Sequence, residues 1–549
     1  LSFASKKTFL PVFMSNKRIY FVLTLFSAVF FVIYLFLYWP GAIKSDNLIL
    51  NQPDESVNYY FISEFVLRDN FRVPEPLSLI TANQVHPRST TIIYGAMVPI
   101  GFPGIIVLFG TVLKLLTRVF GYTYFDYFAV ALTPLLGALL PILLFNFFKK
   151  LTNTSAAFLT AMLAYILPCW WYYSSRPFQH NVLFVFLFVC FLLAGARTVS
   201  ENNKKIGRFW SMVSGFCFGL SIYTRPNEAA WFALLALLLM YYFRKRLNWM
   251  NVAMFFTVLL FVGWLFAATQ MIYYGHPFGS GYVRPQTDGS GGILFNKGTW
   301  ALAKQFLLPF GFHFKTMLKT FWHYGGTLFA AWFIFSLLSF FVGFTRNRQS
   351  DDVLLPKVYY VFYFFFAFYL LTYYGSWRFT DNVMNLPSIG TSYARYFLPA
   401  YIFGLPILAE WLVSTYEWNK FGKVLTVIFV AILLFSSYRA VFAPLEGLGS
   451  IKSIVKRYDE WQNAVYSQTG TKSVIVTRYA DKYLFPGRKI ITEWSSTEAK
   501  QAIKALVARD VPVYWFDLKQ IKIPVFEKVK LSDTILTIDN LELRKFEEI

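Results

Sequence analysis

A short acidic and aromatic stretch, NQPDESVNYYFISEF at residues 51–65, opens the first polar segment of the chain. Asp54 and Glu55 are adjacent carboxylates, and either could accept the proton of an attacking hydroxyl group as a general base. The stretch also predicts a helix, because Pro53 and two acids suit a first turn and apolar residues follow at helical spacing. By spacing alone, the catalytic and helix-terminus interpretations both stay open. They are compatible if an amphipathic helix lies at a membrane surface.

Three further polar segments carry cations and aromatic residues that could hold an anionic substrate. They are NQVHPRST at 83–90, MIYYGHPFGSGYVRPQTDGSGG at 271–292, and GSWRFTDNVMNLPSIGTSYARYFLP at 375–399. Guanidinium groups bind phosphate through charge-assisted, often bidentate hydrogen bonds. Arginines could therefore hold a sugar that is joined through phosphate to a lipid, while a carboxylate activates the acceptor hydroxyl and the leaving phosphate is stabilised electrostatically.

The composition places these segments in a membrane protein. Hydrophobic residues make up 56% of the 549 residues and charged residues only 15%, whereas soluble domains carry roughly 25% charged residues. Several runs of about 20 residues, long enough to cross the bilayer core, contain no charged side chain. The formal net charge of +22 comes mostly from cations between apolar runs. We therefore assign it to membrane topology and lipid headgroups, and we expect no nucleic acid partner.

The apolar segments, about twelve in number, follow one another between residues 19 and 440. Basic residues precede the first segment and cluster near 149, 197–208, 244–246, 346–357 and 420–423. Because cytoplasmic loops are rich in Lys and Arg, we expect the N-terminus and all five clusters in the cytoplasm. Two crossings between residues 90 and 150 would place the basic cluster near 149 outside the cell. One crossing must therefore be added or removed in this part of the chain. We expect the breaks from Pro99 to Gly104 to let that segment dip and return as two short pieces.

The last part of the chain has a different pattern. TKSVIVTRY, STEAKQAIKALVARD and VPVYWFD predict strand, helix and strand, with Ser496 or Thr497 as the helix N-cap. We predict an all-α polytopic membrane domain at 1–440, with about 12–13 transmembrane helices and an external loop at 40–90 that carries interfacial helices. A small extracytoplasmic α/β domain is predicted at 441–549.

One N-terminal span, an external loop with Pro53-Asp54-Glu55 and a tyrosine at position 59 resemble the GT-C superfamily of polytopic glycosyltransferases. The likeness is greatest to the protein O-mannosyltransferase-like family, which includes the aminoarabinose transferase of lipid A, and it covers residues 1 to about 440. The oligosaccharyltransferase branch fits poorly, because its Asp-x-Asp pair and Trp-Trp-Asp motif are missing here. The resemblance implies a catalytic role for Asp54, with Glu55 beside it positioning the base or the acceptor.

The resemblance also implies the substrate. A polyprenyl-phosphate sugar would be the donor, and the acceptor would be an extracytoplasmic lipid, glycan or protein hydroxyl. His86-Pro87-Arg88 departs from the basic-Pro-Pro pattern of the family. Whether His86 or Arg88 contacts the phosphate therefore stays open. The substrate-binding candidates are Tyr59, His86, Arg88, His276, Tyr282, Arg284 and Arg395. We predict no metal site and expect no cofactor, although a divalent cation could meet Asp54, Glu55 and His276.

The predicted function is therefore a glycosyltransferase of the cytoplasmic (inner) membrane, in contact with membrane lipids, that transfers one sugar with inversion. A polytopic transporter or lipid flippase is one alternative, since about twelve spans also suit secondary transporters, although the acids here lie at loop edges rather than within spans. A polymerase or ligase that uses a lipid-linked glycan is the other.

Overall fold

The computed structural model describes residues 15–38, 48–101, 103–281, 307–308, 310–345, 355–377, 379, 387–521 and 528–549. By their contacts, the residues form two compact units. The first comprises 1–37, 131–262 and 287–450, and the second comprises 38–130, 263–286 and 451–549. The contacts group the C-terminal region with residues 38–130, so the domain boundary near residue 440 remains a prediction.

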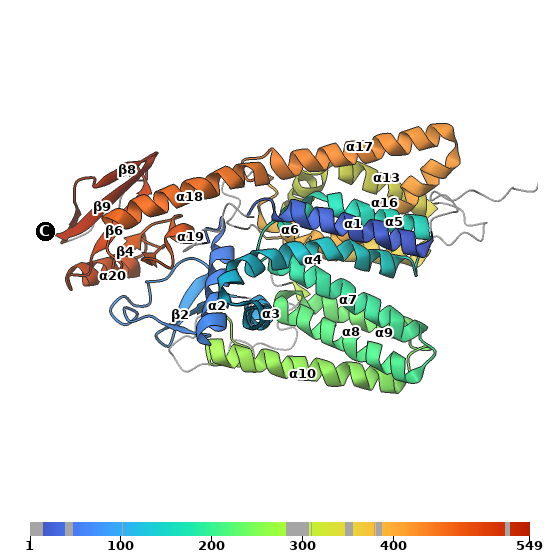
Figure 1. The fold of residues 1–549 in the computed structure, drawn as a ribbon, viewed down its shortest axis with the longest axis horizontal. Coiled ribbons are helices and arrows are strands. Elements are labelled where there is room, and N and C mark those ends of the chain that lie inside the picture. Colours follow the sequence, from blue (N-terminus) through green and yellow to red (C-terminus); the bar gives the residue numbers. More distant parts are fainter. Residues whose placement is uncertain are drawn as a thin grey trace, which may run out of the picture. The chain divides into compact units, whose positions relative to one another are not determined.

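The first unit is a bundle of helices (Figure 1). Long helices with apolar sequences make up its walls, and α4 and α10 continue into the second unit. The helices are α1 (Asn16–Leu35), α4 (Phe125–Phe148), α5 (Thr154–Ile166), α6 (Pro168–Ser174), α7 (His180–Ser200), α8 (Lys204–Thr224), η2 (Pro226–Glu228), α9 (Ala229–Tyr242), α10 (Trp249–Tyr274), α12 (Phe314–Phe321), η3 (Trp322–Thr327), α13 (Ala330–Thr345), α14 (Lys357–Gly375), α15 (Ser392–Tyr396), α16 (Leu398–Trp418) and α17 (Lys420–Phe442).

The polytopic membrane fold predicted from the sequence is confirmed. Among the described residues, eight helices are long and apolar enough to cross a membrane, and up to ten spans result if each of two bent helix pairs is one span. The bent pairs join α5 to α6 and α12–η3 to α13. The polar start of α8 and the short length of α9 keep these two helices out of that count. When α8 and α9 are added to the ten possible spans, the described helices match the roughly twelve apolar segments predicted from the sequence.

Several basic clusters gather at one end of this bundle. Lys149 Nζ donates to Asn16 Oδ1 at 2.7 Å, and Lys150 Nζ donates to Ser200 Oγ at 3.0 Å. Leu151 packs beside Leu355 at the entry to α14. The start of α1, the end of α4, the α7–α8 turn and the start of α14 therefore lie at one end, as expected for loops that share one side of a membrane.

In the second unit, the stretch of residues 51–65 forms the predicted helix, α2 (Pro53–Arg68). The helix ends where Asp69 adopts a left-handed conformation with φ 57°. A three-stranded antiparallel sheet follows, with β1 (Val73–Pro74), β2 (Thr90–Ile93) and β3 (Ala96–Pro99) in the order β1-β3-β2. Next come α3 (Pro103–Phe120) and the short η1 (Tyr122–Tyr124).

The expectation of two short helical pieces around Pro99 to Gly104 is wrong. The residues before the break form the β2–β3 hairpin, because Tyr94 and Gly95 both take positive φ and allow the tight turn. After the break α3 is one helix, which Pro103 begins. Figure 1 shows α3 nearly end-on, whereas the C-terminal end of α10 lies along the picture. Within the second unit, α3 therefore runs crosswise to that end of α10.

The C-terminal residues form an α/β domain, as predicted. It contains α18 (Leu448–Gln468), β4 (Val474–Val476), α19 (Asp481–Leu484), β5 (Lys489–Ile491), α20 (Thr497–Val507), β6 (Val513–Leu518), β7 (Val529–Leu531), β8 (Leu536–Ile538) and β9 (Leu541–Glu548). The strand order is β5-β4-β6-β9-β7, with β8 paired to β9. β4 is parallel to β5 and β6, whereas β9 is antiparallel to its neighbours. Ser496 is the N-cap of α20, since its side chain accepts from the Ala499 amide.

Part of the segment between α1 and α3 packs into this domain. Val85 is buried in the same apolar core as Val474, Ile491 and Trp515. His86 pairs in parallel with Ile491 and so extends the β5 edge of the sheet. Residues 84–90 thus leave the α/β domain and lead directly into β2, which places this segment between the sheet and α2.

Candidate active site

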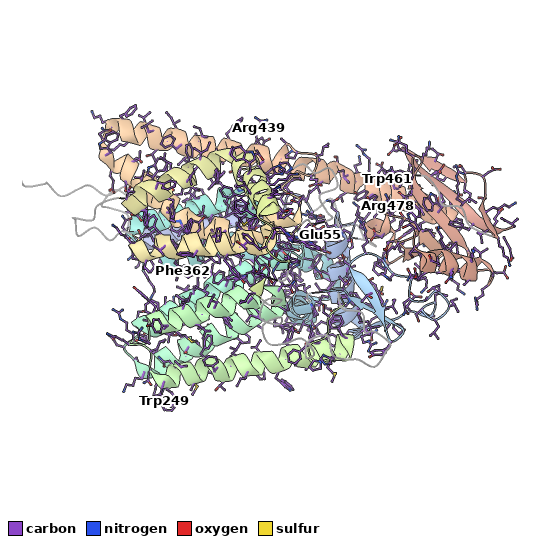
Figure 2. The ribbon with its side chains drawn as sticks, turned by 180° about the vertical axis from the view of Figure 1, so that it is seen from behind. Glu55, Trp249, Phe362, Arg439, Trp461 and Arg478 are labelled. Atoms are coloured by element: carbon purple, nitrogen blue, oxygen red, sulfur yellow. The ribbon has the colours of Figure 1, made fainter. Side chains whose placement is uncertain are left out.

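The first turn of α2 is fixed by its own backbone contacts. Glu55 is fully buried, and its Oε2 accepts from the amides of Asn51 and Gln52 at 3.2 and 3.1 Å. These amides precede or begin the helix and would otherwise lack intrahelical acceptors. Glu55, which Figure 2 labels on α2, therefore holds the helix start in place. This arrangement suits a positioning role.

Asp54 lies beside the segment that leads into β2. Its Oδ1 accepts a hydrogen bond from Ser89 Oγ at 2.5 Å, and the residue is half-buried. Ser89 has φ 62°, a left-handed conformation that non-glycine residues adopt only when the surrounding structure enforces it. A hydroxyl donor orients a carboxylate without neutralising it. The hydrogen bond from Ser89 thus helps to fix the orientation of the Asp54 carboxylate.

Arg88, a candidate phosphate ligand, is bound to the α/β domain. Asp481 accepts from Arg88 Nε at 3.0 Å, from Nη2 at 2.5 Å and from the backbone amide at 3.0 Å. Asp481 is 1% exposed, and the Arg88 guanidinium also lies over the ring of Tyr479 at 5.3 Å. The arginine therefore joins residues that are 393 positions apart in the sequence.

Tyr59 lies one turn beyond Asp54 on α2. Its hydroxyl donates to Asp126 Oδ1 at 2.6 Å. Burial raises the pKa of the Tyr59 phenol, and the Asp126 carboxylate raises it further. Tyr59 consequently stays a neutral hydrogen-bond donor, which links α2 to the start of α4.

The two candidate histidines belong to the same unit as Asp54 but differ in surroundings. His86 is half-buried, with Nδ1 at 3.0 Å from the Pro87 carbonyl oxygen. His276 is exposed, and its Nδ1 accepts from the Phe278 amide at 3.2 Å. The segment that carries His276 packs on the β2–β3 hairpin, where Tyr274 donates to the Pro99 carbonyl at 2.9 Å.

Three other candidates cannot be joined to Asp54. Tyr282 and Arg284 lie outside the described residues. Arg395 belongs to the helix bundle, at the end of α15, where its Nη2 donates to Ser392 Oγ at 3.0 Å and its guanidinium lies 5.3 Å from the Tyr396 ring centre. The structure brings together Asp54, Glu55, Tyr59, His86, Arg88 and His276 within one compact unit.

Sequence reasoning missed Ser89 and Asp481. Ser89 follows Arg88 directly, but serine is common in loops and its positive φ has no signature in a single sequence. Asp481 follows strand β4 at the C-terminal edge of parallel strands, a place where α/β sheets often carry functional residues. Its place after a strand could have marked Asp481 as a candidate functional residue. The sequence does not show that its partner is Arg88.

The described residues contain no group of three or more His, Cys, Asp or Glu side chains that could hold a metal ion. Asp54, Glu55 and His276 thus form no such set in this part of the chain. One of the similar structures, the oligosaccharyltransferase of Archaeoglobus fulgidus, was solved in complex with zinc and sulfate. We assign no step of the chemistry to a metal.

The fold resembles two kinds of solved membrane enzyme. The apo oligosaccharyltransferase of Archaeoglobus fulgidus has a TM-score of 0.57 and 14% identity, over 92% of this chain and 70% of the other. The same enzyme with an inhibitory peptide and a dolichol-phosphate gives 0.53 and 13% identity, with the same coverage. ArnT from Cupriavidus metallidurans, bound to undecaprenyl phosphate, gives 0.51 and 11% identity, over 97% of this chain and 98% of the other.

No protein-family model matches the sequence, and no curated protein matches it. At 11–14% identity the likeness concerns the fold. It extends over nearly the whole chain, and therefore over both the helix bundle and the α/β domain. The resemblance noted from the Pro-Asp-Glu loop is thus confirmed at the level of the fold: this chain has a GT-C fold, which it shares with these solved structures.

Proposed function

We propose that the protein is a membrane glycosyltransferase that moves one sugar from a polyprenyl-phosphate donor to a hydroxyl group of an extracytoplasmic acceptor. The observation that carries the proposal is the position of Asp54, a half-buried carboxylate on the first turn of α2 that is oriented by Ser89. The GT-C fold supports it, since the similar structures include one with dolichol-phosphate and one with undecaprenyl phosphate.

The proposed reaction is a single displacement. Asp54 takes the proton of the acceptor hydroxyl while that oxygen forms a bond to the anomeric carbon. The bond from the anomeric carbon to the phosphate oxygen breaks, and its electrons leave with the lipid phosphate. One displacement inverts the anomeric configuration. Glu55 holds the helix start and Tyr59 holds its next turn, so that the base keeps its orientation.

Cationic side chains would stabilise the leaving phosphate. His276 is proposed as one of its ligands, together with Tyr282 and Arg284 from the same Gly-rich stretch of the sequence, and Arg395 stays a candidate from the sequence alone. Arg88 engages Asp481 in this structure, so a phosphate contact from Arg88 would compete with that ion pair. His86, next to the segment that carries Ser89, is proposed to line the donor site.

The proposed orientation has the basic end of the bundle in the cytoplasm and the second unit outside, in the cytoplasmic membrane. The basic side chains at the ends of α4 and the α7–α8 turn support this orientation. If the crosswise helix α3 lies at the membrane surface, one crossing between residues 90 and 150 is removed. The basic cluster near residue 149 then lies in the cytoplasm with the others. Exposed apolar residues on α3, such as Leu115 and Val119, suit contact with lipid.

The test is sugar transfer by purified protein with a panel of polyprenyl-phosphate monosaccharides. We expect Asp54→Asn to lower kcat on the order of 10²–10⁴-fold, the usual contribution of a general base. Asp69→Asn is the matched control, because Asp69 lies at the other end of α2 and is exposed. Full turnover by the Asp54→Asn variant would show that another group is the base.

A second candidate is the transfer of a whole lipid-linked oligosaccharide, which the likeness to the oligosaccharyltransferase favours. The same panel separates the two, if it includes a polyprenyl-diphosphate oligosaccharide. A transporter or flippase would instead show substrate-driven flux in proteoliposomes and no transfer with any donor.

A further inference from the structure

The first external loop and the α/β domain meet at two places on α2. Ser56 Oγ donates to the Lys482 carbonyl at 2.8 Å, and the Tyr60 ring meets the Phe485 ring edge-on at a centroid distance of 4.6 Å. Lys482 lies within α19, and Phe485 directly follows it. One face of α2, beginning two residues after Asp54, is therefore supported by the C-terminal domain.

A third connection leads from the α/β domain to Asp54 through Arg88 and Ser89. Asp481, the first residue of α19, binds both the guanidinium and the backbone amide of Arg88. A carboxylate that accepts from the side chain and the amide of the same residue fixes the backbone of that residue as well as its charge. The next residue, Ser89, then takes φ 62° and donates to Asp54.

Other hydrogen bonds hold the same turn. Thr90 Oγ1 donates to the Pro87 carbonyl at 2.8 Å, and the Ile100 amide donates to the Ser89 carbonyl at 2.9 Å. With both neighbours fixed, the Ser89 hydroxyl has little freedom to leave Asp54. The left-handed conformation of Ser89 is a cost that these contacts together offset.

We infer that Asp481 is a positioning residue, through which the C-terminal α/β domain sets the orientation of Asp54 by way of Arg88 and Ser89. The inference deepens the proposed function and rests on it for the role of Asp54. It gives the α/β domain a part in the chemistry although none of its residues need touch the substrate. The effect of losing Asp481 should then appear in turnover rather than in donor binding.

The experiment compares the full-length protein with its Asp481→Asn and Ser89→Gly variants. Glu542→Gln is the control, because Glu542 is also a buried acid of the α/β domain paired with an arginine, Arg544. Ser89→Gly removes the hydroxyl but suits the positive φ, so the turn itself should persist. Two readouts are measured, steady-state transfer and amide hydrogen exchange of residues 48–65 and 84–93.

We expect Asp481→Asn and Ser89→Gly each to lower kcat by about 10–100-fold, with the donor KM changed less than about twofold, as misplacement of a reacting group does. Amide exchange near residues 54 and 88 should be faster in Asp481→Asn than in Glu542→Gln. Wild-type kcat in Ser89→Gly, or a donor KM that rises while kcat stays constant, would overturn the inference.

Hydrogen exchange separates this inference from the proposed function. If the wild-type protein transfers no sugar from any donor, the proposed function fails, and the exchange data still decide the link between Asp481 and α2. Faster exchange around residue 54 in Asp481→Asn supports the link. Unchanged exchange at both peptides contradicts it.

Discussion

Two carboxylates, Glu228 in the helix bundle and Asp54 on α2, are held in opposite ways. Glu228 is 2% exposed and accepts from Arg225 Nε at 2.8 Å, from the Tyr374 hydroxyl at 2.6 Å and from the Trp231 indole nitrogen. Asp54 is half-buried, and a neutral hydroxyl orients it. The enclosed Glu228 stabilises the bundle, whereas the partly exposed Asp54 is open to a substrate, as its proposed role requires.

The two acids also differ in the sequence distance of their partners. Arg225 and Glu228 are three residues apart at the α8–α9 turn, so local structure brings them together. The contacts that orient Asp54 come from residue 89 and, through Arg88, from residue 481. A local pair stabilises one turn, while a long-range chain of contacts couples separate segments.

The largest expected effect is on the stability of the bundle. Glu228→Gln leaves the buried Arg225 without its carboxylate, and removing one partner of a buried ion pair costs roughly 3–5 kcal/mol. Thermal or denaturant unfolding of the purified protein measures it. Asp54→Asn is the comparison, and its loss of stability should be smaller, because Asp54 is only half-buried. Equal destabilisation by both variants would erase the distinction between the two acids.

The packing of α3 against α2 depends on Gly110, which lies against the ring of Phe65. A Cβ atom at this position would lie 2.3 Å from Cδ1 of Phe65, so Gly110→Ala forces α2 and α3 apart. Overpacking of this kind costs about 1–3 kcal/mol. We expect lower stability together with lower kcat, since α2 carries Asp54. Gly263→Ala is the control, because nothing lies within 4 Å of a Cβ atom added there.

The division of roles between the adjacent acids on α2 gives the third prediction. Glu55→Gln weakens the two charge-assisted hydrogen bonds to the amides before the helix, at a cost of about 1 kcal/mol. We expect a loss in kcat that is much smaller than that of Asp54→Asn, measured in the same transfer assay. A loss as complete as that of Asp54→Asn would mean that Glu55 itself reacts.

The smallest effect concerns alkaline pH and the α/β domain. Burial raises the pKa of Tyr466 to about 12, while the Arg488 guanidinium lowers it in part. The folded domain favours the neutral phenol, whose hydroxyl donates to the Leu484 carbonyl at 2.8 Å. Its contribution to stability is therefore complete below the ordinary tyrosine pKa of about 10 and is lost as the pH rises through 12.

The measurement is the pH dependence of unfolding between pH 9 and 12, for the wild type and Tyr466→Phe. The variant should lose less stability across this window, because it has no phenol to ionise. Parallel curves for the two proteins would show that the pKa of Tyr466 is the same in the folded and the unfolded protein.

The sequence by itself determined most of the helices of this protein. Apolar runs long enough to cross a bilayer fixed the helices of the bundle, since only regular hydrogen bonding satisfies the backbone in lipid. Pro53, Asp54 and Glu55 marked the start of α2, and Ser496 marked the start of α20. These signals are local, because helix propensity and capping depend on residues only a few positions apart.

Only the tertiary structure decided which elements meet. The pairing of His86 with Ile491 and the ion pair of Arg88 with Asp481 join segments about 400 residues apart, and no pattern in one sequence specifies such a partner. The same holds for the β2–β3 hairpin, where apolar residues typical of a span form strands instead. Local sequence made Asp54 the candidate base, and packing over long sequence distances determined how it is held.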